Sequence, residues 1–456
     1  MIEGLKQYAE YKESGQEWLG GVPAHWDLKP GHAAFAKRKE SNRGMKEKIV
    51  LSLSYGRIKV KATEKQHGLV PESYETYQVV NEGNVIIRGT DLQNDHTSLR
   101  IGLSRNRGII SSAYLCLQAL PSITPDYGYQ ILNVFDLTKA IYRYGSGLRQ
   151  NLDHGEIKRL PIFLPPLDEQ AAIVRFLDHA NRKIDGFIRA KRKLIGLLNE
   201  QKQAIIHRAV TRGLHPDVPH KPSGISWLGN IPKHWGIVRN MALFAHRVEP
   251  GIAGLPVLQV SLRSGITAEE LDQFGRPKRL IADAKKYKRI HQGDMAYNTM
   301  RMWQGAVGVS PSDGLVSPAY VVLKPRKDTC PEFYDFIFHT EIYKQQVNRQ
   351  STGIVSDRNR LYWDSFKQMP NLLLPFAEQE EIVAFITKET AVLKTAIART
   401  EREIALMQEY RARLTADLVT GRLDVREAAS RLPEPADQPT VEEAIDENEA
   451  DLQDEP

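Results

Sequence analysis

The chain has 456 residues, of which 41% are hydrophobic and 26% charged, so it is long enough for two or more globular domains. It has no apolar run of the length that spans a bilayer, and its polar N-terminus does not resemble a secretory signal. Only two cysteines occur, Cys116 and Cys330. These features exclude a disulfide scaffold and predict a cytoplasmic protein without a membrane span.

The charge is distributed unevenly along the chain. Residues 430–456 hold ten acidic side chains and one basic one, so the remaining residues carry a formal charge of +15, compared with +6 for the whole chain. A basic body favours a polyanionic partner, because each Lys or Arg on a phosphate releases condensed counterions. The acidic end, which also contains four prolines, predicts a disordered tail.

The first distinctive segment, Ser14–Trp26, contains two tryptophans and recurs as Ser223–Trp235. Eight of the thirteen positions are identical, at an offset of 209 residues. A second block beginning at Pro165 recurs from Leu374 at the same offset, and thirteen of fifty positions match without a gap. Two separate blocks at one offset indicate a duplicated unit of about 209 residues.

The regions between these blocks, 27–163 and 236–372, have a mixed pattern. Short β-branched runs separated by Gly, Pro, Asn and Asp predict strands, and longer periodic stretches predict helices. The expected strands are 48–53, 83–88, 113–117, 257–262 and 319–323, and the expected helices are 128–142 and 331–349. Each region therefore predicts an α+β globule.

Each globule is followed by a long helical pattern. The first covers Leu167 to about Arg212 without a proline, and the second covers Ala377 to about Thr420. About 45 residues at 1.5 Å each give a rod of roughly 65 Å. The narrow apolar stripes and charged flanks favour pairing of the two helices as an antiparallel coiled coil, with separate packing on each globule as the alternative.

No catalytic signature is recognisable in the sequence. It lacks a GxxxxGK[ST] phosphate loop, a strand–GxGxxG–helix unit, an HExxH motif and the Asn/Asp-Pro-Pro-aromatic tetrapeptide of amino-methylating enzymes. His25 and His234 repeat, but each lies inside the tryptophan-bearing block, where a structural role is the better interpretation. We therefore expect no catalytic residue and no metal ligand in this chain.

The block W-L-G-x-[IV]-P-x-H-W and the helix start P-x-x-E-Q-x-x-I-V-x-F, each present twice at one spacing, resemble the specificity subunit of Type I restriction–modification systems. The resemblance covers roughly residues 14–425. It implies target-recognition domains at 1–163 and 215–372, and spacer helices at 164–214 and 373–426. The acidic tail, at 427–456, is not part of the family pattern.

The resemblance also implies partners. Each recognition domain reads one half of a split double-stranded DNA target, and two modification subunits that bind S-adenosylmethionine methylate adenine N6. Restriction subunits that use ATP and Mg add translocation and cleavage. This chain itself would bind no cofactor.

Side chains that read DNA must reach base edges in the major groove, while Lys and Arg hold phosphates. We select basic residues for phosphate or guanine contacts and amides for adenine edges, although surface ion pairs and turn caps are the alternatives. The candidates are Arg57, Lys59, Arg88, Gln93, Asn94, Arg105, Arg107, Arg149 and Gln150 in the first globule, and Arg263, Asn298, Arg301, Arg349, Arg358 and Arg360 in the second.

Two other functions fit the same sequence. A free-standing DNA-binding protein would bind its target without a methylase partner. A nuclease with an unrecognised site would cut DNA alone in a metal-dependent reaction.

Overall fold

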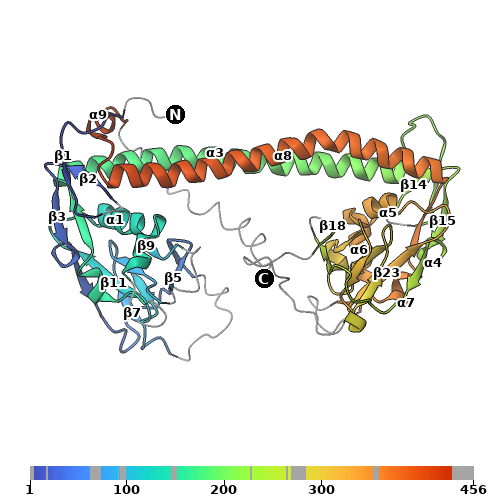
Figure 1. Cartoon of the computed structure of the whole chain (residues 1–456), viewed down its shortest axis with the longest axis horizontal. Coiled ribbons are helices and arrows are strands. Elements are labelled where there is room, and N and C mark those ends of the chain that lie inside the picture. Colours follow the sequence, from blue (N-terminus) through green and yellow to red (C-terminus); the bar gives the residue numbers. More distant parts are fainter. Residues whose placement is uncertain are drawn as a thin grey trace. The chain divides into compact units, whose positions relative to one another are not determined.

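The computed structural model describes residues 5–16, 19–61, 73–90, 92, 99–144, 151–225, 228–262, 265–268, 284–352 and 359–433. The chain forms two compact units, each containing one globule and part of both long helices (Figure 1). Unit 1 combines residues 1–190 with residues 403–456, and unit 2 consists of residues 191–402. Unit 1 is therefore assembled from the two ends of the sequence.

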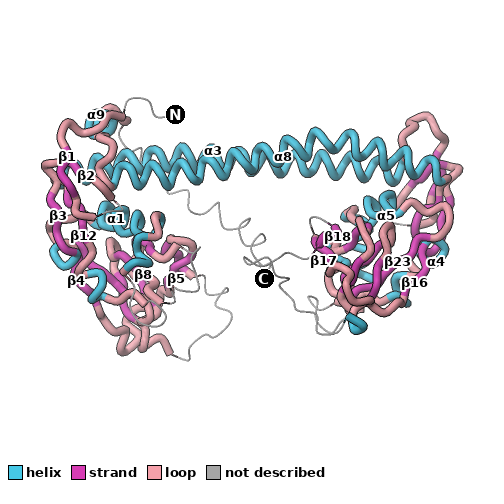
Figure 2. The backbone as a smooth tube through the Cα atoms, viewed as in Figure 1, coloured by secondary structure: helices cyan, strands magenta, loops and turns pink. Residues whose placement is uncertain are grey.

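Both units contain a four-stranded antiparallel sheet with the same strand order. Figure 2 shows the strands of each unit in magenta. In unit 1 the order is β4 (Phe35–Arg38), β11 (Leu115–Ala119), β8 (Val85–Ile87) and β9 (Ile101–Leu103). In unit 2 it is β16 (Phe244–Arg247), β23 (Tyr320–Pro325), β20 (Met295–Asn298) and β21 (Val307–Val309). The shared topology confirms the predicted duplication of an α+β globule.

Antiparallel strand pairs surround each sheet, and every pair in unit 1 has a counterpart in unit 2. In unit 1 they are β1 (Tyr11–Glu13) with β2 (Gly21–Pro23), β3 (Asp27–Pro30) with β12 (Pro161–Leu164), β5 (Leu51–Ser54) with β6 (Arg57–Val60), and β7 (Gln78–Val80) with β10 (Gly108–Ile110). In unit 2 they are β13 (His220–Pro222) with β14 (Asn230–Pro232), β15 (Gly236–Arg239) with β24 (Pro370–Leu373), β17 (Leu258–Ser261) with β18 (Gly265–Ala268), and β19 (Lys288–Ile290) with β22 (Gly314–Val316).

Short helices complete the two globules. In unit 1 these are η1 (Gly31–Ala33), α1 (Pro125–Leu137), η3 (Ala140–Arg143) and α2 (His154–Ile157). In unit 2 they are α4 (Asn240–Leu243), η4 (Ala284–Lys286), η5 (Met302–Gln304), α5 (Pro331–Phe338), α6 (Glu341–Gln350) and α7 (Trp363–Phe366).

Two of these helices differ from the sequence-based expectation. The helix expected over 331–349 is divided into α5 and α6, because the Thr340 hydroxyl accepts from the Tyr343 amide and starts a new helix. The helix expected over 128–142 begins earlier, at Pro125, and α1 ends at Leu137. Lys139 then adopts a left-handed conformation (φ 57°), which breaks the helical path.

The two long helices have the predicted spans. Helix α3 covers Leu167–Arg212, and α8 covers Phe376–Val419. In unit 1, Ile173 and Leu177 near the start of α3 share a core with Leu414 and Leu418 near the end of α8.

The opposite ends of the two helices meet in unit 2. Here Ile206 and Val210 near the end of α3 share a core with Ile382 and Ile386 near the start of α8. Within each unit the two helices therefore pack antiparallel (Figure 1), which confirms the predicted pairing.

The C-terminal part of the described chain returns to unit 1. The acidic tail was expected to begin at residue 427, but α9 (Arg426–Ser430) is a short helix whose Ala429 is buried in the unit 1 core together with Val425. The prediction was therefore wrong for residues 427–433, because apolar contacts hold this segment against unit 1. Residues 434–456 lie outside the described part of the chain.

Each long helix ends at a glycine with a positive φ, Gly213 (φ 70°) after α3 and Gly421 (φ 75°) after α8. A Cβ on Gly421 would lie 2.3 Å from Cδ of Pro23, whereas a Cβ on Gly213 meets nothing closer than 3.4 Å. We expect Gly421→Ala to cost about 3 kcal/mol in unit 1 and Gly213→Ala about 1–2 kcal/mol in unit 2. Urea unfolding with segment-resolved hydrogen exchange measures both, and equal costs would contradict this steric argument.

Candidate nucleic-acid interface

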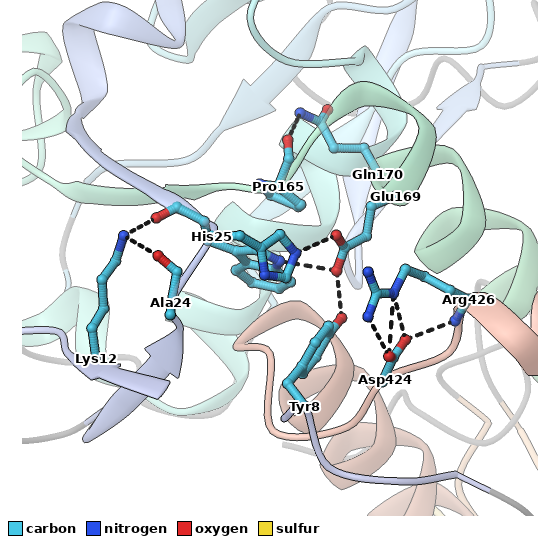
Figure 3. A network of polar contacts seen from close by, with 10 residues as sticks. Tyr8, Lys12, Ala24, His25, Pro165, Glu169, Gln170, Asp424 and Arg426 are labelled. Atoms are coloured by element: carbon cyan, nitrogen blue, oxygen red, sulfur yellow. Dashed lines mark hydrogen bonds and ion pairs between the residues drawn. The ribbon is translucent and has the colours of Figure 1, made fainter. Parts of the chain in front are cut away.

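The tryptophan-bearing block of unit 1 is attached to α3 through the buried carboxylate of Glu169, whose side chain is 2% exposed. This carboxylate accepts hydrogen bonds from the Tyr8 hydroxyl (2.5 Å) and from Nε1 of Trp26 (2.9 Å). His25 Nε2 lies 2.8 Å from its other oxygen (Figure 3). Trp26 is fully buried. His25 is therefore part of a packing contact, as its repeated context predicted.

In the described part of unit 2 the same arrangement occurs without a tyrosine equivalent to Tyr8. Glu378 on α8 accepts from Nε1 of Trp235 (3.0 Å) and lies 2.8 Å from Nε2 of His234. Its side chain is 17% exposed. Trp26 and Trp235 thus attach each globule to its long helix. Trp18 and Trp227 lie outside the described residues.

The glutamine of the repeated Glu-Gln pair holds a different part of each globule. Gln170 accepts from the Thr124 amide (2.9 Å), just before α1, and donates to the Pro165 carbonyl (2.9 Å). Gln379 accepts from the Cys330 amide (2.8 Å), just before α5. The Glu-Gln motif therefore connects each long helix to two parts of its unit. The glutamate binds the tryptophan block, and the glutamine binds the α+β globule that lies between that block and the helix.

The predicted DNA-contacting residues of unit 1 lie on exposed loops and edges. Arg57 and Lys59 are on β6, and Arg88 follows β8. Arg105 and Arg107 lie in the turn between β9 and β10, where Arg105 pairs with Asp126 (2.6 Å) and Arg107 with Glu47 (3.3 Å). Gln93, Asn94, Arg149 and Gln150 lie outside the described residues.

Arg57 and Arg105 both lie close enough to Tyr129 of α1 to affect its pKa. Burial raises the pKa of Tyr129, and both guanidinium groups act against this shift. Two predicted cations, 48 positions apart in sequence, therefore belong to one surface region. Arg88 and Arg107 contribute to other parts of the same globule.

In unit 2 the structure places Asn298 at the end of β20 and Arg301 just before η5, and the Arg301 amide donates to the Asn298 carbonyl (3.1 Å). Arg349 is exposed near the end of α6. Arg360 is exposed just before α7. Arg263 and Arg358 lie outside the described residues.

Arg360 lines a cavity of about 390 Å³ beside α7. The side chains around Arg360 were not predicted from the sequence, although the basic and aromatic residues of the run Arg358–Trp363 were a usable signal. The other lining residues are His246, Lys288, Thr299, Met300, Pro318, Ala319, Val321, Tyr362, Trp363 and Asp364.

Aromatic rings and two cationic side chains, Lys288 and Arg360, line this cavity. The His246 and Trp363 rings are stacked, with centroids 5.2 Å apart and an interplanar angle of 25°. Burial lowers the pKa of His246, so this ring is neutral at pH 7. Lys288 donates to the Tyr320 carbonyl (2.6 Å), and the Asp364 carboxylate pairs with Lys367 (2.6 Å).

No helix in the described part of the chain is long and apolar enough to span a bilayer. In the same residues, no group of three or more His, Cys, Asp or Glu side chains is arranged to hold a metal ion.

Comparison with known proteins links this architecture to one family. No family model matches the chain. A protein of Methanocaldococcus jannaschii named as the MjaX type I restriction enzyme specificity subunit is 23% identical over 320 residues, which is 67% of this chain and 69% of that protein. A chain from a structural study of the assembly and conformational transition of the type I restriction–modification system has a TM-score of 0.60. The chain is therefore similar in sequence to a type I specificity subunit and in fold to a chain of a type I restriction–modification system.

The structural match covers 87% of this chain and 98% of the solved chain at 13% identity, so it shows a common fold. The HsdS subunit of Thermoanaerobacter tengcongensis covers a similar share, 88% of this chain and 98% of its own, with a TM-score of 0.42 and 14% identity. The resemblance inferred from the repeated motifs is thus confirmed.

Proposed function

We propose that this chain is the non-catalytic DNA-recognition subunit of a type I restriction–modification complex. Each unit reads one half of a bipartite double-stranded DNA target in the cytoplasm of a prokaryotic cell. Two modification subunits bind S-adenosylmethionine and methylate adenine N6 in each half. Restriction subunits that require ATP and Mg complete the assembly.

The observation that carries this proposal is the duplication of an entire globule with a changed surface. The two units share strand order, and each uses a Glu-Gln pair to attach its globule to a long helix. Their central regions otherwise differ in sequence. Two related scaffolds with different side chains suit the recognition of two different half-sites, and the basic body suits a DNA partner.

The predicted division into recognition domains, at 1–163 and 215–372, and spacer helices, at 164–214 and 373–426, is part of the proposal. The paired helices separate the two readers, as dimer spacing does in other bipartite DNA-binding proteins. Among the predicted contacts, Arg57, Lys59, Arg88, Arg105 and Arg107 serve the first half-site. Asn298, Arg301, Arg349 and Arg360 serve the second.

Methylome sequencing tests this function directly. Cells that express this chain together with the adjacent modification gene should contain N6-methyladenine in both halves of one bipartite motif. Cells that express the modification subunit alone should lack methylation of that motif. Methylation that persists unchanged without this chain would remove the specificity role.

The two alternative functions predict other results for the purified chain. A free-standing DNA-binding protein would select a specific duplex without the modification subunit. A nuclease would cleave DNA alone in the presence of a divalent metal. We expect neither result for the purified chain. In the proposed complex, this chain recognises DNA together with the modification subunits, and the partner subunits carry out methylation and cleavage.

A further inference from the structure

The strands around the cavity of unit 2 have equivalents in unit 1, and the contacts that hold these strands are repeated. We call these strands and contacts the frame. On the equivalent strands β4 and β16, Arg38 pairs with Glu40 and Arg247 pairs with Glu249, in both cases at 2.5 Å. These pairs occupy the same positions in their strands and fix the same edge of each sheet.

The neighbouring strands β7 and β19 repeat a second contact. Gln78 donates to the carbonyl of Tyr114 (2.7 Å), and Lys288 donates to the carbonyl of Tyr320 (2.6 Å). The Gln78 amide and the Lys288 ammonium group therefore make equivalent hydrogen bonds in the two units. The frame is conserved between the units, so differences in the side chains on it are not consequences of a different backbone.

On this common frame, the side chains that line the cavity have changed. His246 of β16 corresponds to Lys37 of β4, and Trp363 at the start of α7 corresponds to His154 at the start of α2, both at the offset of 209. Lys37 and His154 are near enough that the lysine charge helps to lower the pKa of the histidine, after the larger effect of burial. The same corner therefore holds a stacked His–Trp pair in unit 2 and a lysine cation with a histidine in unit 1.

The rim of the cavity combines features of a contact surface for bases. Tyr362 is 49% exposed and Met300 is 41% exposed, so two large apolar side chains face solvent beside the Arg360 guanidinium. Among the described residues, no carboxylate pairs with Arg360, since Asp364 is engaged by Lys367. An accessible guanidinium is the side-chain group that most often recognises guanine, through its O6 and N7 atoms.

We propose that this cavity is the base-reading site of unit 2, in which Arg360 contacts a guanine of the second half-site and Tyr362 and the His246–Trp363 pair shape the adjoining position. The corresponding corner of unit 1, with Lys37 and His154, reads a different base. This inference rests on the proposed function and adds to it the residues that determine specificity in one half of the target.

The test is binding selection from a randomised DNA duplex library by the complex of this chain with its modification subunit. In Arg360→Ala, the preference for guanine at one position of the second half-site should fall roughly 5- to 150-fold. The first half-site should be unchanged. Introducing the unit 1 residues, as His246→Lys with Trp363→His, should change the preferred base near that position and leave the first half intact.

Arg326 provides a matched control, because it is an exposed arginine of the same unit that donates to the Met241 carbonyl (3.0 Å) and does not line the cavity. Arg326→Ala should retain both half-site preferences. The inference is overturned if Arg360→Ala weakens binding equally for all sequences and lowers the slope of log affinity against log salt concentration by about one. That result identifies a phosphate contact. An unchanged motif also overturns it.

Two further outcomes remain distinguishable. If Arg360→Ala and Arg360→Gln both abolish selection in both halves, the cavity is structural and the inference is wrong, because a local reader affects its own half. If the unaltered complex selects no bipartite motif, the proposed function itself fails.

Discussion

Replacing Glu169 with alanine should destabilise unit 1 by about 3–5 kcal/mol, because the substitution leaves buried donors without their shared acceptor. The Tyr8 hydroxyl and the Trp26 indole N–H both donate to this carboxylate, and neither side chain has access to water in its place. Urea unfolding followed by tryptophan fluorescence gives the free energy of unfolding. Segment-resolved hydrogen exchange assigns the loss to unit 1.

Glu378→Ala is the matched control in unit 2. Among the residues that the structure describes, Glu378 has the equivalent tryptophan and histidine partners but no tyrosine, and it is more exposed than Glu169. Its removal should therefore cost less, about 1–3 kcal/mol, since water can reach some of the freed donors. Equal losses for the two substitutions would show that burial and the additional tyrosine do not determine the stability of this contact.

Removing residues 421–456 should unfold much of unit 1 while leaving unit 2 intact. The segment contributes buried Val425 and Ala429 to the unit 1 core, and the Asp424 amide donates to the Lys6 carbonyl (2.7 Å). Arg175 of α3 donates to the Leu432 carbonyl (2.6 Å). The lost apolar burial alone corresponds to about 3–6 kcal/mol. Hydrogen exchange of peptides from each unit measures the effect.

A shorter truncation separates this structural role from that of the acidic residues. Deletion of residues 434–456 removes ten acidic side chains and no basic one, which raises the formal charge from +6 to +16. We expect unit 1 to retain its stability and non-specific DNA affinity to increase at low salt. Unfolding of unit 1 by the shorter truncation would place the essential contacts beyond residue 433.

The duplicated organisation could be predicted because it depends on local and periodic features. Identical residues at one offset reveal a repeat without any knowledge of contacts, and a stripe of apolar residues at helical spacing indicates a helix before its partner is known. The span of α3 was predicted correctly, and α8 differs by one residue at each end. The family resemblance rested on the same repeated blocks.

Features that depend on distant partners could not be predicted. The Glu-Gln motif was recognised as a repeat, but its purpose became apparent only when Glu169 was found beside Trp26, 143 positions earlier in the chain. The ordered segment around Ala429 was misread as part of the acidic tail, since its burial depends on unit 1 contacts that the local composition does not reveal.

The sequence by itself determined the duplication, the two long helices and the mixed character of each globule, because these follow from repetition, periodicity and composition. The repeated motifs also carried the resemblance to specificity subunits. Only the tertiary structure decided which of many basic residues share a surface. Arg57 and Arg105 both lie near Tyr129, and Arg360 lines one cavity with the His246–Trp363 pair, through sheet pairings between segments far apart in the chain. Such pairings depend on non-local contacts, which no sequence window contains.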